Sequence, residues 1–236
     1  MAAVRLLGVQ HGSEFRGSAR RRGVSAQMGD RATIPRCGGW FNRSFHFRVS
    51  SGPKDEFFIG VLSGTSVDAV DAALVRFSAQ VELVATNTLP YPPELRAELL
   101  GLAVPGENEI ERLGSADVSV GRHFAQAVNE LLDFARIPRT QVRAIGSHGQ
   151  TVRHRPRRAV PFTLQVGDPN VIAAATGVPV VADFRRKDMA LGGQGAPLVP
   201  AFHAAIFASA EEARVVVNIG GIANITVLPL DPTVPV

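Results

Sequence analysis

Residues 63–71 read SGTSVDAVD. After the first serine, this short glycine-containing turn has two hydroxyl side chains, Thr65 and Ser66, and two carboxylates, Asp68 and Asp71. The turn lies between the apolar runs FFIGVL and AALVRF, which predict strands. Backbone amides in such a turn can bind phosphate oxygens, and carboxylate oxygens are ligands that Mg²⁺ prefers. The same residue types are also common in an ordinary hairpin turn. The residues alone therefore leave two interpretations open, a phosphate cradle and a plain turn.

A second unit of the same kind, RVVVNIGGIANITVL, lies at 214–228. Its pattern predicts a strand, a glycine-rich turn and another strand, as in the first unit. Two turns that present small residues can clamp a polyphosphate between them, because phosphate approaches the backbone closely there. Most turns of this composition bind nothing, so the pairing supports the phosphate interpretation without deciding it.

Asp183 is the candidate for catalytic chemistry, since it ends the apolar run VPVVAD. An open α/β sheet presents its functional groups at the carboxyl ends of its strands, and a carboxylate there can act as a general base. Asp183 can equally cap the next turn or pair with Arg185, Arg186 or Lys187. Both interpretations stay open at this point.

Two further polar groups are candidates for ligand contacts. Gln194 lies in the glycine-rich segment GGQGAPL, where the backbone can approach a ligand, although a simple flexible loop is an alternative. His148 and His154 lie six residues apart across an expected turn, a spacing without a metal signature. We expect His148 to have a structural role or to form a hydrogen bond with substrate.

The elements that position these residues begin with three strands. The segments 57–62, 72–77 and 81–91 predict an antiparallel meander, because only short turns separate them. Residues 92–102 predict a helix that opens with proline. Apolar residues at helical spacing predict a long amphipathic helix over 110–137, with Gly114 and Gly121 as weak points.

The second part of the chain alternates between strands and helices. Residues 142–149 and 178–183 predict buried strands, and a basic turn at 151–161 precedes a strand at 162–167. Asp168 as N-cap, Pro169 at the first helical position and Gly177 as C-cap predict a helix between them. A glycine-rich loop then leads into an apolar helix at 201–210.

Composition restricts the class of protein. The chain has 236 residues, of which 45% are hydrophobic and 19% charged, enough apolar residues for a globular core. No uninterrupted apolar run approaches the roughly 18–20 residues of a membrane-spanning helix, so we expect a soluble protein without a membrane partner. Cys37 is the only cysteine, which excludes an intrachain disulfide and agrees with a reducing compartment, the cytoplasm.

Positive charge is concentrated at the start of the chain. Residues 1–54 carry ten basic and two acidic side chains, which leaves 15 basic and 19 acidic ones for 55–236. The body is therefore mildly acidic, and we expect no nucleic-acid partner. We interpret 1–54 as a disordered or mis-annotated extension, for which Met28 is one internal alternative start. An organelle transit peptide and an RNA-binding arm are the other interpretations.

Four stretches of the sequence resemble the anhydro-N-acetylmuramic acid kinase family. They are IGVLSGTSVDAVDAALV, GSHGQTVRHRP, VVNIGGIANIT and the long TLQVGDPNVIAAATGVPVVADFRRKDMALGGQGAPLVPAFH, and they lie in the family's order. The resemblance implies the ribonuclease H-like, actin/hexokinase-type ATPase fold of the α/β class, with its first half and the start of its second. It implies three regions: the extension 1–54, a first ATPase domain with the sugar site at 55–212, and the first hairpin of a second domain at 213–236.

The resemblance implies an ATP-dependent sugar kinase. Members of the family open the internal ether of 1,6-anhydro-N-acetylmuramic acid with water and phosphorylate the freed O6, giving N-acetylmuramic acid 6-phosphate for cell-wall sugar recycling. Asp183 matches the family's general base, and Gly220 and Gly221 match the second phosphate motif. The residues that match the first phosphate motif are Gly64, Thr65, Ser66, Val67, Asp68, Ala69, Val70 and Asp71.

Within the first motif, the resemblance assigns phosphate contacts to Thr65 and Ser66, and water-mediated Mg²⁺ contacts to Asp68 and Asp71. Ala69 departs from the family, which usually has glycine there. If that position needs a positive φ, alanine costs about 1 kcal/mol.

Members of the family are longer than this chain, so we expect either a fragment or a shortened protein. The family also implies a homodimer. Two other functions stay open: a kinase for a related anhydro sugar of the levoglucosan type, and an inactive remnant that binds sugar without releasing ADP.

Overall fold

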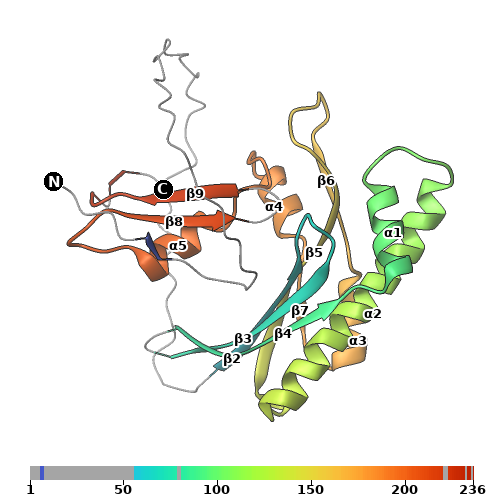
Figure 1. The fold of residues 1–236 in the computed structure, drawn as a ribbon, viewed down its shortest axis with the longest axis horizontal. Coiled ribbons are helices and arrows are strands. Elements are labelled where there is room, and N and C mark those ends of the chain that lie inside the picture. Colours follow the sequence, from blue (N-terminus) through green and yellow to red (C-terminus); the bar gives the residue numbers. More distant parts are fainter. Residues whose placement is uncertain (1–5, 8–55, 79–80, 220–222, 232, 235) are drawn as a thin grey trace, which may run out of the picture. The chain divides into compact units, whose positions relative to one another are not determined.

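The structure is a computed structural model, and it describes residues 6–7, 56–78, 81–219, 223–231, 233–234 and 236 (Figure 1). The chain forms two units, one of residues 1–8 with 53–236 and one of residues 9–52. The second unit, with Met28 and Cys37, lies outside the described residues. No helix in the described part is long and apolar enough to cross a membrane.

The predicted antiparallel meander is confirmed. Strands β2 (Glu56–Ser63), β3 (Ala69–Phe77) and β4 (Val81–Pro90) pair in sequence order. Side chains on β2 and β3 alternate between buried and more exposed positions, as a sheet with one covered face requires. Ile59 and Leu74 lie on the covered face and are almost completely buried.

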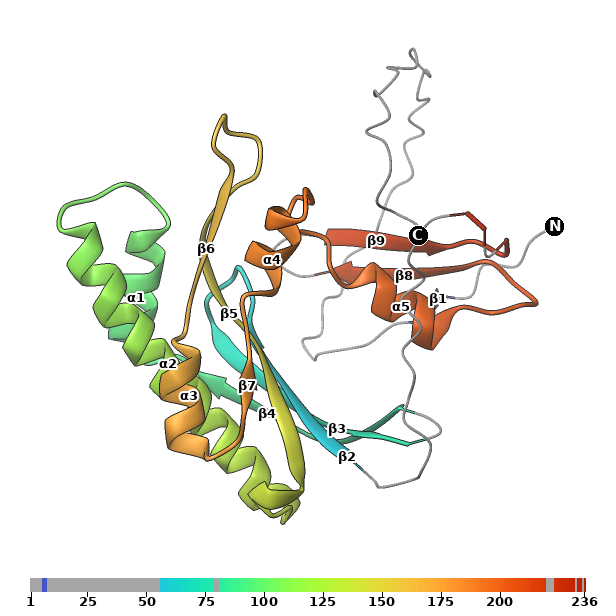
Figure 2. The ribbon, with the colours of Figure 1, turned by 180° about the vertical axis from the view of Figure 1, so that it is seen from behind.

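Two helices follow the meander, as predicted. Helix α1 (Pro93–Leu102) opens with proline, and α2 (Glu109–Ala135) runs along the covered face of the sheet (Figure 2). The apolar stripe of α2, which includes the fully buried Phe124 and Val128, packs on this face. The helix is continuous through both of its glycines, so neither interrupts it.

Strand β5 (Val142–Arg155) follows the short 3₁₀ helix η1 (Arg139–Gln141) and lies parallel to β2, beside which it extends the sheet. Strand β6 (Phe162–Val166) pairs antiparallel with the second half of β5. The predicted basic turn at 151–161 is therefore wrong in its first half, because pairing with β6 keeps the chain extended to Arg155. His148 and His154 consequently lie on one strand and not across a turn.

The capped helix is confirmed as α3 (Pro169–Thr176): the Asp168 Oδ1 accepts a hydrogen bond from the Asn170 amide, and Gly177 has φ 72°. The buried strand predicted at 178–183 is wrong in extent. Strand β7 has only two residues, Val180–Val181, and the second is 53% exposed. A helix that the pattern did not predict, α4 (Phe184–Ala190), follows it.

The main sheet has the order β4-β3-β2-β5-β6, and β7 pairs in parallel with β5. Three antiparallel strands, a helical crossover and a strand parallel to the first give a β-β-β-α-β unit. The α/β fold class is confirmed. Because β2, β5 and β7 are parallel, their carboxyl ends point toward the same edge of this sheet, which β5 passes by continuing to Arg155.

A separate small sheet contains β1 (Leu6–Leu7), β8 (Arg214–Ile219) and β9 (Ala223–Leu228). The predicted strand–turn–strand unit is confirmed as the antiparallel pair β8–β9. The predicted apolar helix is α5 (Pro200–Phe207), which contacts β9 through a hydrogen bond between the His203 Nδ1 and the Thr226 Oγ1, 2.9 Å apart.

Candidate active site

The turn between β2 and β3 is anchored to the neighbouring strand. The Gly64 carbonyl accepts hydrogen bonds from the Val67 amide and from the Gln150 Nε2, each at 3.2 Å. Gln150 is almost completely buried and lies opposite Ser63 in the β2–β5 register. A buried amide thus fixes the first peptide of the turn relative to β5.

The same turn contains an unusual backbone conformation. Val67 has φ 51° although valine is β-branched, and its side chain is only 5% exposed. Ala69 is not among the positive-φ residues of the described chain, so alanine carries no conformational cost there. The strained position is Val67, and burial of its side chain helps to hold it.

Asp68 is held as a carboxylate within the turn. Its Oδ1 accepts hydrogen bonds from the Ser66 Oγ at 2.6 Å and from the Ala69 amide at 3.0 Å. The bond from Ser66 is the largest cause that lowers the pKa of Asp68, so this side chain stays ionised at neutral pH. The Ser66 hydroxyl already has a partner in this arrangement.

Asp71 lies on the face of β3 opposite α2, where its Oδ1 accepts a hydrogen bond from the Thr88 Oγ1 at 2.7 Å. No cluster of three or more His, Cys, Asp or Glu side chains able to hold a metal occurs in the described part of the chain. Mg²⁺ usually keeps several waters and needs only one or two carboxylates. Asp68 and Asp71 place two carboxylates within four residues of each other, in the turn and at the start of β3.

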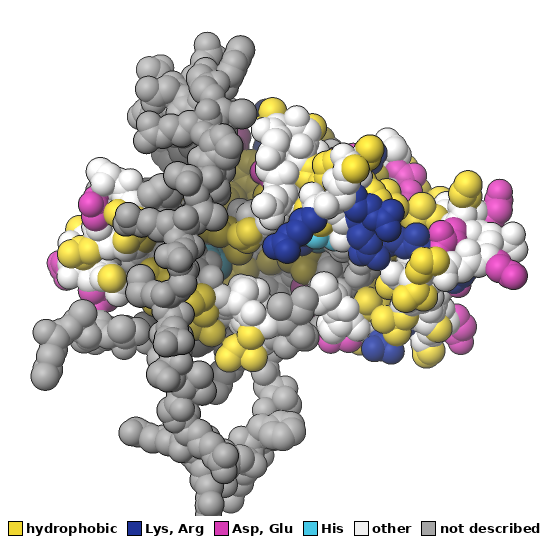
Figure 3. Space-filling model, turned by 90° about the horizontal axis from the view of Figure 1, so that it is seen from above, with side chains coloured by type: hydrophobic (Ala, Val, Ile, Leu, Met, Phe, Trp, Pro, Cys, Tyr) yellow, Lys and Arg dark blue, Asp and Glu magenta, His cyan; other side chains and the backbone are white. Residues whose placement is uncertain are grey.

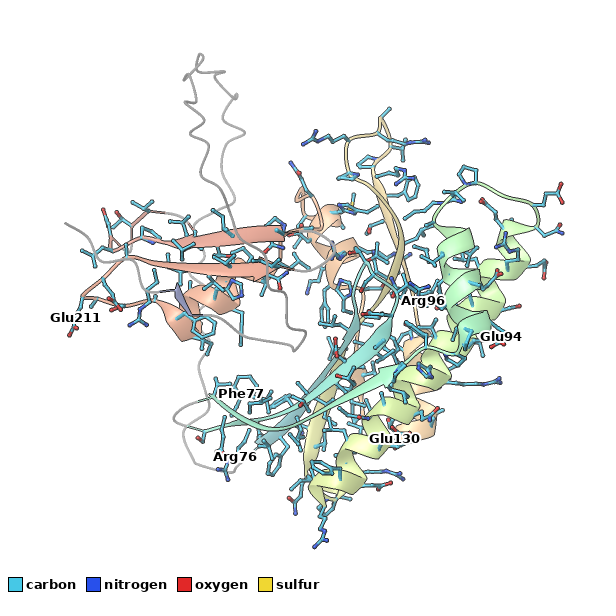
Figure 4. The ribbon with its side chains drawn as sticks, viewed as in Figure 1. Arg76, Phe77, Glu94, Arg96, Glu130 and Glu211 are labelled. Carbon is cyan, nitrogen blue, oxygen red and sulfur yellow. The ribbon has the colours of Figure 1, made fainter. Side chains whose placement is uncertain are left out.

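Helix α1 and the residue Tyr91 that precedes it also contact the turn at 64–71. The Arg96 Nη2 lies 3.4 Å from the Ser66 carbonyl, and Figure 4 shows Arg96 on this helix. The Tyr91 amide donates to the Asp68 carbonyl at 3.0 Å. Burial raises the pKa of the Tyr91 phenol to about 12, although a contact with Ser63 acts in the opposite direction.

Asp183 comes two residues after β7, whose last residue, Val181, pairs with Gly146 in the middle of β5. Asp183 has φ 63°, and its side chain makes no hydrogen bond to cap α4. The Arg186 Nη1 lies 3.2 Å from the Asp183 Oδ1, and both side chains are about 60% exposed. Of the three nearby cations, Arg185, Arg186 and Lys187, Arg186 is the partner. An ion pair this exposed is weak, so it leaves the carboxylate accessible.

His148 has a hydrogen-bond partner on each ring nitrogen. The Arg185 Nε donates to the His148 Nε2 at 2.7 Å, so Nε2 carries no proton and Nδ1 donates to the Gly149 carbonyl at 2.8 Å. Burial is the main cause that lowers the pKa of His148, and the charge of Arg185 acts in the same direction. The imidazole is therefore neutral at pH 7, and it orients Arg185.

The glycine-rich loop after α4 is hydrogen-bonded to that helix. Asp188 accepts the Gly193 amide through its carbonyl at 2.9 Å and the Gly195 amide through its Oδ2 at 2.7 Å. Arg185 Nη1 donates to the Gly195 carbonyl at 3.2 Å. Gly195 has φ 71°, a conformation that favours glycine. Gln194, between these anchored residues, is exposed.

The structure thus brings together residues from distant segments. One hydrogen-bonded group contains His148 of β5, Arg185 of α4 and Gly195 of the loop. Arg185 lies two residues after Asp183 in the sequence. Gly220 and Gly221 lie outside the described residues. The sequence patterns assign no role to Gln150, although it lies within the motif GSHGQTVRHRP. They suggest Arg185 only as a partner of Asp183.

Comparison with known proteins decides the family. A family model described as anhydro-N-acetylmuramic acid kinase matches residues 56–236. The chain belongs to the anhydro-N-acetylmuramic acid kinase family. It is 61% identical over 173 residues to the anhydro-N-acetylmuramic acid kinase of Shewanella amazonensis, which covers 73% of this chain and 47% of that protein.

The anhydro-N-acetylmuramic acid kinase of Shewanella denitrificans is 59% identical over 177 residues, covering 75% of this chain and 48% of that protein. The chain therefore spans about half the length of the curated members of the family that it matches. Among solved structures, it is similar to a ROK hexokinase from Thermus thermophilus, with 19% identity, a TM-score of 0.33, and coverage of 73% of this chain and 46% of that one.

Proposed function

We propose that this chain acts as an ATP-dependent kinase that opens the ring of 1,6-anhydro-N-acetylmuramic acid with water and phosphorylates O6. The product is N-acetylmuramic acid 6-phosphate, an intermediate of cell-wall sugar recycling. The family match over 56–236 is the observation that carries the proposal. The exposed Asp183 and the anchored turn at 64–71, at one edge of the sheet, support it.

Asp183 is the proposed general base. A water oxygen attacks the anomeric carbon, and the Asp183 carboxylate takes the water proton as the bond between C1 and O6 breaks. The electron pair of that bond stays on O6, which attacks the γ-phosphorus of ATP. The bond between this phosphorus and the β,γ-bridging oxygen then breaks and releases ADP. One carboxylate therefore serves both ring opening and phosphoryl transfer.

The proposed phosphate site is the turn of residues 64–71, with Gly220 and Gly221 contributing from the second turn. The Thr65 hydroxyl and the turn's backbone amides would bind phosphate oxygens. Asp68 and Asp71 would orient a hydrated Mg²⁺, which neutralises charge on the phosphates when it is bound. The low pKa of Asp68 supports this role, because the carboxylate stays charged.

The proposed sugar site comprises Gln194, the glycine-rich loop and His148. Gln194 is free to reach a ligand from an ordered loop. His148 uses both ring nitrogens within the protein, so we propose that it acts on the sugar through Arg185. We also propose a cytoplasmic homodimer, and regions at 1–54, 55–212 and 213–236 with the roles that the family implies.

The test is ADP release by the 236-residue chain with Mg-ATP and 1,6-anhydro-N-acetylmuramic acid. We expect ADP that depends on the sugar, with much slower release with levoglucosan and none from Asp183→Asn. Lys187→Asn, an exposed change on the same helix, is the matched control. A folded chain that binds the sugar without releasing ADP would contradict the kinase and favour a sugar-binding protein.

A further inference from the structure

Arg185 carries a positive charge that no carboxylate of the described chain balances. Its hydrogen bonds go to two neutral acceptors, the imidazole of His148 and the carbonyl of Gly195. It takes part in none of the ion pairs of this part of the chain, since Asp183 pairs with Arg186. Burial lowers the pKa of the Arg185 guanidinium, which is half-buried.

An uncompensated cation in such a position is costly unless a ligand supplies the anion. Removing an arginine from water costs free energy that hydrogen bonds to neutral acceptors repay only in part. Arg185 uses Nε and Nη1 for its protein contacts, which leaves Nη2 without a protein acceptor among the described residues. The protein thus holds two of the three guanidinium nitrogens and leaves Nη2 for a ligand.

A second cation, Arg155, adds positive charge nearby, and its Nη1 donates to the His154 carbonyl at 3.0 Å. His154, whose Nδ1 lies 3.1 Å from the Thr163 Oγ1, has its pKa lowered by burial and then by the charges of Arg185 and Arg155. Both guanidinium groups are therefore within electrostatic range of this imidazole. Figure 3, a view from above, shows Lys and Arg side chains gathered on one face of the protein, with histidine beside them. The local charge favours an anion.

We propose that Arg185 binds the carboxylate of an acidic sugar and makes the site selective for a sugar acid over a neutral sugar. This inference rests on the proposed function, because the lactyl group gives 1,6-anhydro-N-acetylmuramic acid one carboxylate. Arg185 follows the proposed base by two residues and bonds to the loop that carries Gln194. A guanidinium fork also matches a carboxylate bidentately.

The contacts of Arg185 favour the sugar over the phosphates of ATP. Its partners belong to the proposed sugar site, and none of its hydrogen bonds in the described chain reaches the turn at 64–71. His148 is a positioning residue in this account. Its neutral ring accepts a hydrogen bond from Nε and holds the guanidinium in place, while Nη2 keeps its hydrogens for a ligand.

The experiment compares two ligands by titration calorimetry with the 236-residue chain. They are 1,6-anhydro-N-acetylmuramic acid and its carboxamide, which is neutral and has the same shape. We expect the wild-type chain to bind the acid about 10- to 100-fold more tightly, as for a hydrogen-bonded charge. Arg185→Met should remove this preference and leave amide binding within about twofold of wild type. Arg185→Lys should keep only part of it.

Lys187→Met is the matched control, because it removes an equal charge from an exposed site on the same helix. It should retain the preference for the acid. Equal binding of acid and amide by the wild type would overturn the inference alone, provided that sugar-dependent ADP release persists. Arg185→Met weakening both sugars equally, or weakening Mg-ATP instead, would also overturn it. Failure of the wild type to bind either sugar would overturn the proposed sugar site as well.

Discussion

Alanine at Gly121 should push α3 away from α2. A Cβ at this position would lie 3.0 Å from the carbonyl oxygen and 3.2 Å from the amide nitrogen of Asp168, and 3.2 Å from the Val171 Cβ. Two of these neighbours are backbone atoms, which cannot rotate away. The Asp168 and Gly167 amides are also bonded to the carbonyl and Oδ1 of Asp117 on α2, at 3.2 and 2.7 Å.

Gly114 in the same helix supplies the comparison, since a Cβ there would meet nothing within 4 Å. Alanine in a helix interior gains about 1 kcal/mol over glycine, and overpacking costs about 1–3 kcal/mol. Gly114→Ala should therefore raise the free energy of unfolding by about 1 kcal/mol, and Gly121→Ala should lower it by about 0–2 kcal/mol.

Urea and thermal unfolding of the two variants measure this difference. The predicted gap of about 1–3 kcal/mol corresponds to roughly 2–12 °C in Tm for a chain of this size. The reasoning would be refuted if Gly121→Ala stabilised the chain as much as Gly114→Ala, because the close contact with α3 would then cost nothing.

Three further predictions concern the pH dependence and the phosphate turn. The hydrogen bond from Arg153 lowers the pKa of Glu109 below its usual 4.5. The pair therefore stabilises the folded chain above pH 4.5, and this stability is lost as the pH falls. Arg153→Met should lower Tm at pH 7 and make the loss of Tm below pH 4.5 less steep. Burial is the main cause that lowers the pKa of His148 below 6.5. The unfolded chain therefore protonates this imidazole at a higher pH than the folded chain does, and stability falls as the pH drops below 6.5. His148→Gln should make Tm depend less on pH in this range, and an unchanged dependence of Tm on pH would count against the neutral ring. Gln150→Leu removes the bond to the Gly64 carbonyl and should cost about 1–2 kcal/mol in urea unfolding while weakening Mg-ATP binding more than sugar binding.

The elements that sequence predicts well have a strong local pattern. The meander follows from alternation, α2 from its apolar stripe, and α3 from Asp168, Pro169 and Gly177 at its ends. The extension of β5 to Arg155 has no such pattern, because its basic residues are kept extended by pairing with β6. Helix α4 is short and presents no apolar stripe, so it also lacks a signal.

In the candidate active site too, only features with a local sequence pattern could be predicted. The position of Asp183 at the carboxyl edge of the sheet was predictable, because an apolar run ends there. Its partner was not, since Arg185 and Arg186 are adjacent in sequence and differ only in the direction that α4 gives them. The bond between His148 and Arg185 joins residues 37 positions apart, and a single sequence carries no information on such a contact.

Analysis of the product by mass spectrometry and ³¹P NMR tests the central claim most directly. The 236-residue chain would be incubated with Mg-ATP and 1,6-anhydro-N-acetylmuramic acid, with Asp183→Asn in parallel. We predict a sugar phosphate that carries phosphate on O6 and is heavier than an intact-ring phosphate by one water, formed only by the chain with Asp183. A phosphorylated sugar with its anhydro ring intact, or the same product from both chains, would contradict the role of Asp183 in coupling ring opening to phosphoryl transfer.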